Sequence, residues 1–185
     1  SKVEVSLAPS KTAIYWKGRT QDLPLSELSA DSVLQGALNS RFALQTEGQD
    51  SGQWLANLTG NVQAEIAPAH ISGVDFNEVL SGELGLDKKV RVTKLHEIKL
   101  LGKIKQGQFE PKRFTLNSQQ FSAAGIGQFD LTNNELQGEL KVNINKSNDN
   151  LVALQGKVLP IQFAGSIEHL QWQLGNKANH SSIPH

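Results

Sequence analysis

The chain has 185 residues, 38% of them hydrophobic, which is enough for one folded core, but no apolar run reaches the roughly 18 residues of a transmembrane helix. Acidic and basic residues are equal in number, so no overall charge recruits nucleic acid, an anionic membrane or an acidic substrate. Cysteine is absent, which excludes disulfides, thiolate nucleophiles, cysteine zinc sites and iron–sulfur clusters.

The first hundred residues are dominated by the alternation of apolar and polar residues that is typical of half-buried strands. Val3, Val5 and Leu7 alternate in this way, and Ile14 and Trp16 share a face in the next run. Further alternating stretches cover residues 38–44, 62–66 and 98–104. Each of these five stretches is a predicted strand.

The segment from residue 120 to residue 145 predicts a hairpin. Phe114 and Leu116 lead into "QFSAAGIGQFDL", where Phe121 and Phe129 share one face. The letters "TNNE" supply a turn, and the returning strand places Leu136, Leu140, Val142 and Ile144 on one face.

The C-terminal strand pattern changes phase. Residues 159–167 carry apolar side chains at odd positions, whereas Leu170, Trp172 and Leu174 are at even positions. This change predicts a bulge or bend between Ile167 and Leu170.

Helix signals are few and short. Asp50 or Ser51 can cap a helix that carries Trp54 and stops at Gly60. The pair Asp75 and Glu78 has the spacing of a capping box. A weaker helix signal surrounds Pro24 in "DLPLSELSADSVL".

These elements predict a mainly β protein: a curved, largely antiparallel sheet, groove-like or partly closed, with two or three short helices. We expect the helices near residues 51–58 and 75–81 to fill part of the sheet's concave face. One domain is expected over residues 1–175, followed by a flexible tail over residues 176–185.

Catalytic and metal-binding motifs are missing from the sequence. There is no G-x-S-x-G elbow, no P-loop and no H-E-x-x-H, and the five histidines lack metal-ligand spacing. "GIGQFD" precedes a turn where a dinucleotide fingerprint requires a helix, so a strand kink is the favoured interpretation. The sequence therefore predicts neither an enzyme nor a cofactor or metal site.

Residues 87–113 hold nine basic side chains against three acidic ones, which is the main charge asymmetry of the chain. The plainest interpretation is a solvated strand face that discourages edge pairing. Contact with anionic lipid head groups or with a protein partner is the alternative. Nucleic acid is disfavoured because every Trp and Tyr lies outside the segment. The candidate basic surface segment comprises Lys88, Lys89, Arg91 and Lys94.

Taken in order, several short motifs resemble the C-terminal region of the AsmA family. They are an L-x-G at Leu58–Gly60, an I-x-G-x-D at Ile71–Asp75, a G-x-G-x-x-D-L at Gly125–Leu131 and an L-P-I-x-x-x-G at Leu159–Gly165. The resemblance covers roughly residues 19–174. Two departures are Pro68-Ala69-His70, where the family usually has Asp-Gly, and Ile167-Glu168-His169, which predicts an extended final strand.

The resemblance implies a periplasmic part of a larger protein, anchored in the inner membrane of a Gram-negative bacterium and involved in outer-membrane biogenesis. Its implied partner is phospholipid or another envelope lipid, carried along a β-lined groove without catalysis. The alternative is an interaction scaffold that assists outer-membrane protein precursors or their assembly machinery. The candidate groove residues are Phe121, Phe129, Leu136, Leu140, Val142 and Ile144.

Overall fold

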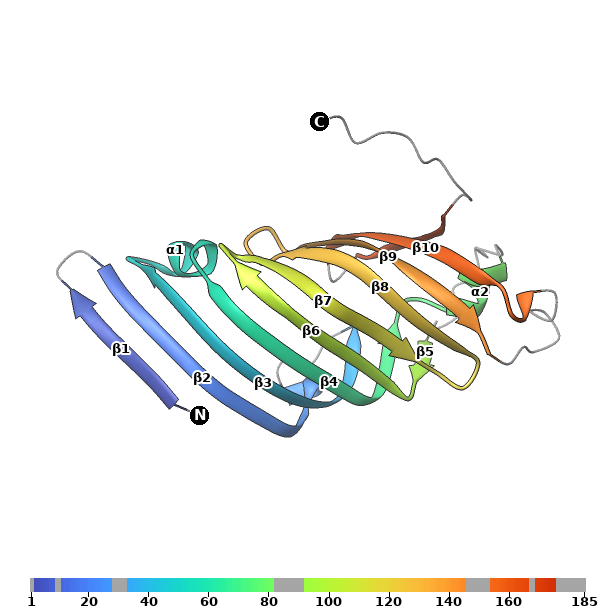
Figure 1. The fold of residues 1–185 in the computed structure, drawn as a ribbon, viewed down its shortest axis with the longest axis horizontal. Helices are drawn as coiled ribbons and strands as arrows, with labels where there is room; N and C mark the ends of the chain where they lie inside the picture. The colour runs from blue at the N-terminus through green and yellow to red at the C-terminus, as the bar shows by residue number, and fades with distance from the viewer. Residues whose placement is uncertain are drawn as a thin grey trace, which may run out of the picture.

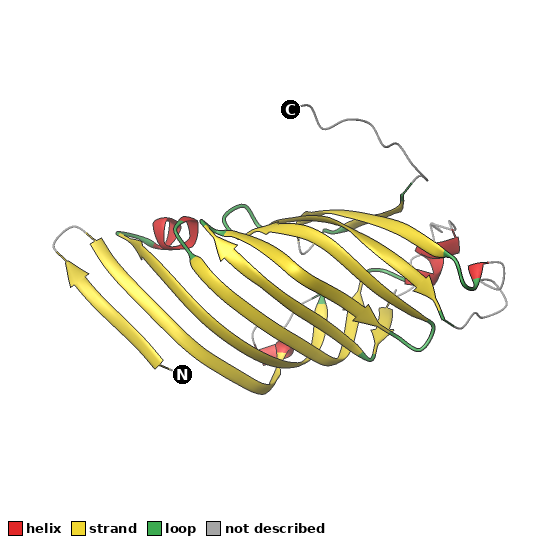
Figure 2. Cartoon of the chain, viewed as in Figure 1, coloured by secondary structure: helices red, strands yellow, loops and turns green. Residues whose placement is uncertain are grey.

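The computed structural model describes residues 2–8, 11–27, 33–81, 92–145, 154–166 and 169–175. These residues form one open antiparallel sheet of eleven strands with few helices, which confirms the predicted fold class (Figures 1 and 2). The strands are β1 Lys2–Ala8, β2 Lys11–Pro24, β3 Leu34–Gly48, β4 Thr59–Ser72, β5 Val92–Leu95, β6 Glu97–Lys105, β7 Gln108–Asn117, β8 Phe121–Asp130, β9 Glu135–Ile144, β10 Val158–Ser166 and β11 Gln171–Leu174. The helices are α1 Ser51–Ala56 and α2 Phe76–Ser81, with a 3-10 turn at Leu25–Glu27.

The strands follow one another across the sheet almost in chain order, from β1 at one end to β10 and β11 at the other (Figure 1). The exception is β4, whose long edge pairs with two strands in tandem. Its first half, Gly60–Ile66, pairs with β6, and its last residues, Ala69–Ser72, pair with β5. In the chain, α2 lies between β4 and β5, and β6 follows β5 directly.

The sheet has an apolar face and a polar face, which we call the core face and the outer face. The strand register aligns apolar residues into rows that cross the core face. One such row runs through Leu38, Ile66, Ile98, Leu116, Ala123, Val142 and Leu159. Because successive side chains point to opposite faces, the polar residues between these positions lie on the outer face.

The sheet curves so that its core face is concave. Phe114 of β7 and Phe163 of β10 meet edge to face, with ring centroids 6.5 Å apart. Their strands are separated by β8 and β9, and in a flat sheet they would lie about 14 Å apart at the usual strand spacing. Gly127 and Gly138 make this approach possible, because the Phe163 ring lies over them where side chains would otherwise stand.

Helix α2 fills one end of the concave face. Phe76 is 1% exposed, and its ring stacks on Phe121 at 5.3 Å and meets the edge of Trp172 at 5.0 Å. The start of the helix is also held by Thr93 of β5, whose hydroxyl accepts from the Phe76 N–H at 3.1 Å and donates to the Val74 carbonyl at 2.8 Å. The side chain of Glu78, the second member of the predicted capping box, lies outside the described residues.

Helix α1 begins as predicted and lies over the end of the core face, where Thr46 of β3 donates to the Trp54 carbonyl and the Trp54 side chain packs against Gly48. The Asp50 side chain caps it by accepting from the Gln53 N–H at 2.9 Å. No residue of α1 is buried, and Trp54 donates to the Gly48 carbonyl at the end of β3. The helix ends at Ala56, so the prediction that Gly60 stops it is wrong, because Gly60 lies inside β4. Of the helix expected around Pro24, the described residues show only the turn at Leu25–Glu27.

The hairpin predicted for residues 121–145 is confirmed, with Phe121 opposite Ile144 and Phe129 opposite Leu136. At its turn, the Asp130 carboxylate accepts from the backbone N–H groups of Thr132 and Asn133 at 2.8 and 3.0 Å. These bonds hold the pKa of Asp130 below its usual value.

Between β10 and β11 the chain reverses, which agrees with the predicted bend and not with a bulge, and the expected extended final strand is wrong. Strand β10 ends at Ser166, and β11 returns antiparallel to it, so that Trp172 lies opposite Phe163. A reversal restores the apolar facing as well as a bulge would, because the pairing itself places Trp172 on the core face. The predicted tail at 176–185 lies outside the described residues.

Candidate functional site

The core face is divided into a covered part and an uncovered part. Around α2, Leu140, Val142 and Ile161 are completely buried. At the other end, on β1 and β2, Val5 is 57% exposed and Trp16 is 45% exposed. Trp16 contacts Phe42 of β3 edge to face at 4.8 Å. Apolar side chains therefore remain open to solvent on the concave face at the β1 end.

An apolar row crosses the core face from the uncovered part on β2 to the end of the β8–β9 hairpin that is farther from α2. It crosses eight strands in register, and apart from its two glycines every member is hydrophobic. The row consists of Trp16, Leu44, Gly60, Ile104, Phe109, Phe129, Leu136 and Gly165. Ile104 and Phe109 are buried, whereas Trp16 at one end and Leu136 near the other are partly or largely open.

All six predicted groove residues lie on the core face, but in different surroundings. Phe121, Leu140, Val142 and Ile144 are buried in the covered part, where they pack in one cluster with α2. Phe129 and Leu136 face each other at the other end of the hairpin and are only partly buried. In this structure only these last two are placed to meet a ligand without displacement of α2.

The predicted basic segment is only partly described. Lys94 is exposed on β5, opposite His70 of β4, whereas Lys88, Lys89 and Arg91 lie outside the described residues. The neighbouring basic residues Lys99, Lys103 and Lys105 are exposed on β6. Strand β6 lies between β4 and β7, so these lysines do not protect a sheet edge as the sequence suggested.

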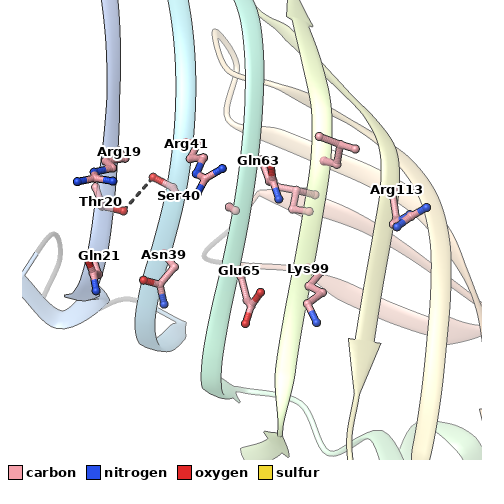
Figure 3. A pocket seen from close by; sticks show the side chains of 13 residues that line it. Arg19, Thr20, Gln21, Asn39, Ser40, Arg41, Gln63, Glu65, Lys99 and Arg113 are labelled. Carbon is pink, nitrogen blue, oxygen red and sulfur yellow. Dashed lines mark hydrogen bonds between the residues drawn. The ribbon is translucent and has the colours of Figure 1, made fainter. Parts of the chain in front are cut away.

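A second candidate site lies on the outer face. Five strands align Arg19, Arg41, Gln63, Leu101 and Arg113 in one row, which we call the arginine row. Figure 3 shows Arg19 and Arg41 side by side on β2 and β3, with Arg113 farther along the sheet on β7. The row borders a shallow hollow of about 520 Å³.

The charges around this hollow are unequally compensated. Lys99 is bound to Glu97 at 2.5 Å and lies opposite Glu65, so two carboxylates compensate its charge locally. The hydrogen bond from Lys99 is the main cause that lowers the pKa of Glu97, and it raises the pKa of Lys99. Arg19, Arg41 and Arg113 are exposed, and among the described residues none of them forms an ion pair.

Sequence reasoning counted Arg113 among the nine basic residues of the range 87–113 but missed Arg19 and Arg41. These two residues are 22 positions apart in the chain and lie opposite each other only because of the β2–β3 register. The sequence does show that Arg19 and Arg41 are at odd positions of their strands, whereas Trp16 and Phe42 are at even positions. Because side chains alternate along a strand, the arginines lie on the face opposite the aromatic rings. This alternation alone could not show that the two arginines are adjacent on neighbouring strands.

The described residues contain no group of three or more histidine or acidic side chains placed to hold a metal ion. Within the same part of the chain, no helix combines the length and the apolar character needed to cross a membrane. Comparisons with protein-family models, with curated proteins and with solved structures found no match. The two faces of the sheet are therefore the basis for a functional proposal.

Proposed function

We propose that the chain is a non-enzymatic periplasmic module of an AsmA-like, inner-membrane-anchored envelope protein, and that it handles phospholipid during outer-membrane biogenesis. The observation that carries this proposal is the uncovered part of the concave apolar face, where Val5 and Trp16 are largely exposed. A soluble domain usually covers such a face, so its exposure favours an apolar ligand or partner.

The shape and chemistry of this face suit an acyl chain. Burying about eight methylene groups there would contribute on the order of 6 kcal/mol before the cost of ordering the lipid. The apolar row extends from Trp16 to Phe129 and Leu136 without a charged side chain. An acyl chain could therefore lie across several strands while its polar head group stays in water.

The proposal is tested with a phospholipid that carries a photoreactive group at the end of one acyl chain. We expect the label to map to Trp16, Leu44 or Leu136 after irradiation, and phospholipid to be recovered by mass spectrometry from the natively purified chain. Trp16→Asp should lower the labelling at least about tenfold, because a carboxylate on the path disfavours apolar contact.

The matched control is Ile126→Asp. Ile126 is 72% exposed and lies on the outer face, opposite Glu139, so the same chemical change is made away from the proposed path. Labelling in this variant should equal that of the wild type. Equal losses in both variants, or labels distributed over both faces, would exclude acyl binding on the core face.

A second function, an interaction scaffold for outer-membrane protein precursors, is favoured by the sheet edge at β1. This strand pairs with β2 on one side, and no described strand pairs with its other side. An extended precursor segment could add to this edge by backbone hydrogen bonding. Photocrosslinkers placed in β1 should then capture a precursor peptide, and their failure to do so while acyl labelling persists would eliminate the scaffold.

A further inference from the structure

The arginine row places like charges directly opposite each other. Arg19 and Arg41 are register partners on adjacent strands, where side chains stand about 5 Å apart at Cβ and like charges are destabilising. Neither has an acidic partner among the described residues. This repulsion would be relieved by an anion that bridges the two guanidinium groups.

The surroundings of the row indicate what kind of anion fits. The neighbouring hollow on the same face is lined by Ala43 and Leu101 together with Lys17, Arg19 and Arg41, whose long side chains carry aliphatic stems. Leu101, which stands between Gln63 and Arg113 in the row, is 38% exposed. An apolar floor surrounded by cations is suited to an amphipathic partner, because a small hydrophilic anion would gain nothing from the leucine.

The row is broad and shallow, spanning five strands, or about 19 Å at the usual strand spacing. A small ligand usually binds in an enclosed cavity, which this surface does not provide. We propose that the outer face of β2, β3, β4, β6 and β7 binds the surface of a bilayer that contains anionic phospholipid, with a head-group phosphate between Arg19 and Arg41. Arginine suits this role because its planar guanidinium group donates two parallel hydrogen bonds to a phosphate.

This site goes beyond the lipid handling proposed above. Acyl chains would be held on the core face, whereas the arginine row binds an intact membrane surface on the outer face. The one opposing charge in the hollow is Glu65, which lies opposite Lys99. Because the two sites lie on opposite faces, a substitution that abolishes binding on one face should leave binding on the other face intact.

The test is co-sedimentation of the 185-residue chain with vesicles. One set is pure phosphatidylcholine, and in the other about a third of the lipid is phosphatidylglycerol. We expect binding only to the anionic set, and weaker binding as salt is raised. Because one basic residue near an anionic surface contributes about fivefold in affinity, Arg19→Gln/Arg41→Gln should bind about 25-fold more weakly.

The matched control is Lys141→Gln/Lys157→Gln, which removes the same charge from exposed positions on β9 and just before β10. This variant should bind like the wild type. Equal loss in the two variants would show that only net charge matters and would overturn the proposal. Because the arginine change removes a repulsion, thermal unfolding should show no destabilisation, which separates lost binding from lost folding.

Two further probes distinguish the sources of anionic charge. Inorganic phosphate should release the chain from vesicles no more effectively than another salt at the same ionic strength. Tighter binding of free phosphate or of polyglutamate than of the anionic vesicles would overturn the proposal in favour of a small-anion or acidic-peptide site. Persistent vesicle binding in the Trp16→Asp variant is expected, because that residue lies on the core face.

Discussion

Gly138→Ala is expected to destabilise the fold, although alanine normally improves a strand. Gly138 lies opposite Gly127 on β8 and opposite Phe163 on β10. A Cβ at this position would stand 2.8 Å from the Gly127 Cα and closer still to the Ile126 carbonyl oxygen and the Phe163 ring. Real Cβ atoms essentially never approach other atoms to less than 3.0 Å.

The size of the effect follows from two opposing contributions. Replacing a strand glycine by alanine stabilises by about 0.5–1 kcal/mol through the unfolded chain, whereas overpacking costs about 1–3 kcal/mol. Two of the three obstacles are backbone atoms held in the sheet, so the overpacking cost should dominate. We expect a net loss of about 1–2 kcal/mol, or a fall in Tm of about 2–8 °C for a chain of this size.

The assay is thermal and denaturant unfolding of Gly138→Ala, Phe163→Leu and the double variant. Shortening Phe163 removes one obstacle, so the double variant should be more stable than the sum of the single effects by at least about 0.5 kcal/mol. Strict additivity would mean that Phe163 does not lie over Gly138. A Gly138→Ala variant more stable than the wild type would refute the close approach altogether.

Three other changes have defined outcomes. Thr93→Val should cost about 1–3 kcal/mol by denaturant unfolding, because the buried Phe76 N–H and Val74 carbonyl lose their partner, whereas Thr93→Ser should retain most of the stability. Asp50→Ala should cost about 1 kcal/mol or less through the lost cap of α1, and Asp50→Asn should be nearly neutral, as read from Tm. Asp130 has a lowered pKa in the folded chain, so its contribution is present at neutral pH and is lost as the pH falls through that value. The stability gap between wild type and Asp130→Ala should therefore be widest at pH 7 and close in acid; an unchanged gap would contradict the role of the carboxylate at the turn.

Local patterns predicted much of the sheet because their information is contained in a few consecutive residues. The alternation from Phe121 to Ile144 specifies both strands and the buried face, and "TNNE" specifies where the chain turns. The Asp50 cap was predictable for the same reason, since its partner is three residues away. These features required no knowledge of distant segments.

Features that depend on register between distant segments were not predictable. Thr93 contributes to the start of α2 because β5 places its hydroxyl beside the Phe76 N–H, 17 residues away in the chain. The opposition of Arg19 and Arg41 depends on the β2–β3 register, which includes an irregularity between Thr20 and Leu23. Period-two patterns locate a face but do not state which residues on neighbouring strands are aligned.

The almost sequential strand order has a consequence for how such a protein could vary in length. Among the described residues, each strand from β7 onward pairs only with its neighbours in the chain, and β1 is attached through β2 alone. A duplicated hairpin could therefore be appended at that end without rethreading any existing connection. The concave wall would lengthen by increments of one hairpin, as in proteins built from repeats, while the segment around α2 would remain a fixed terminal cap.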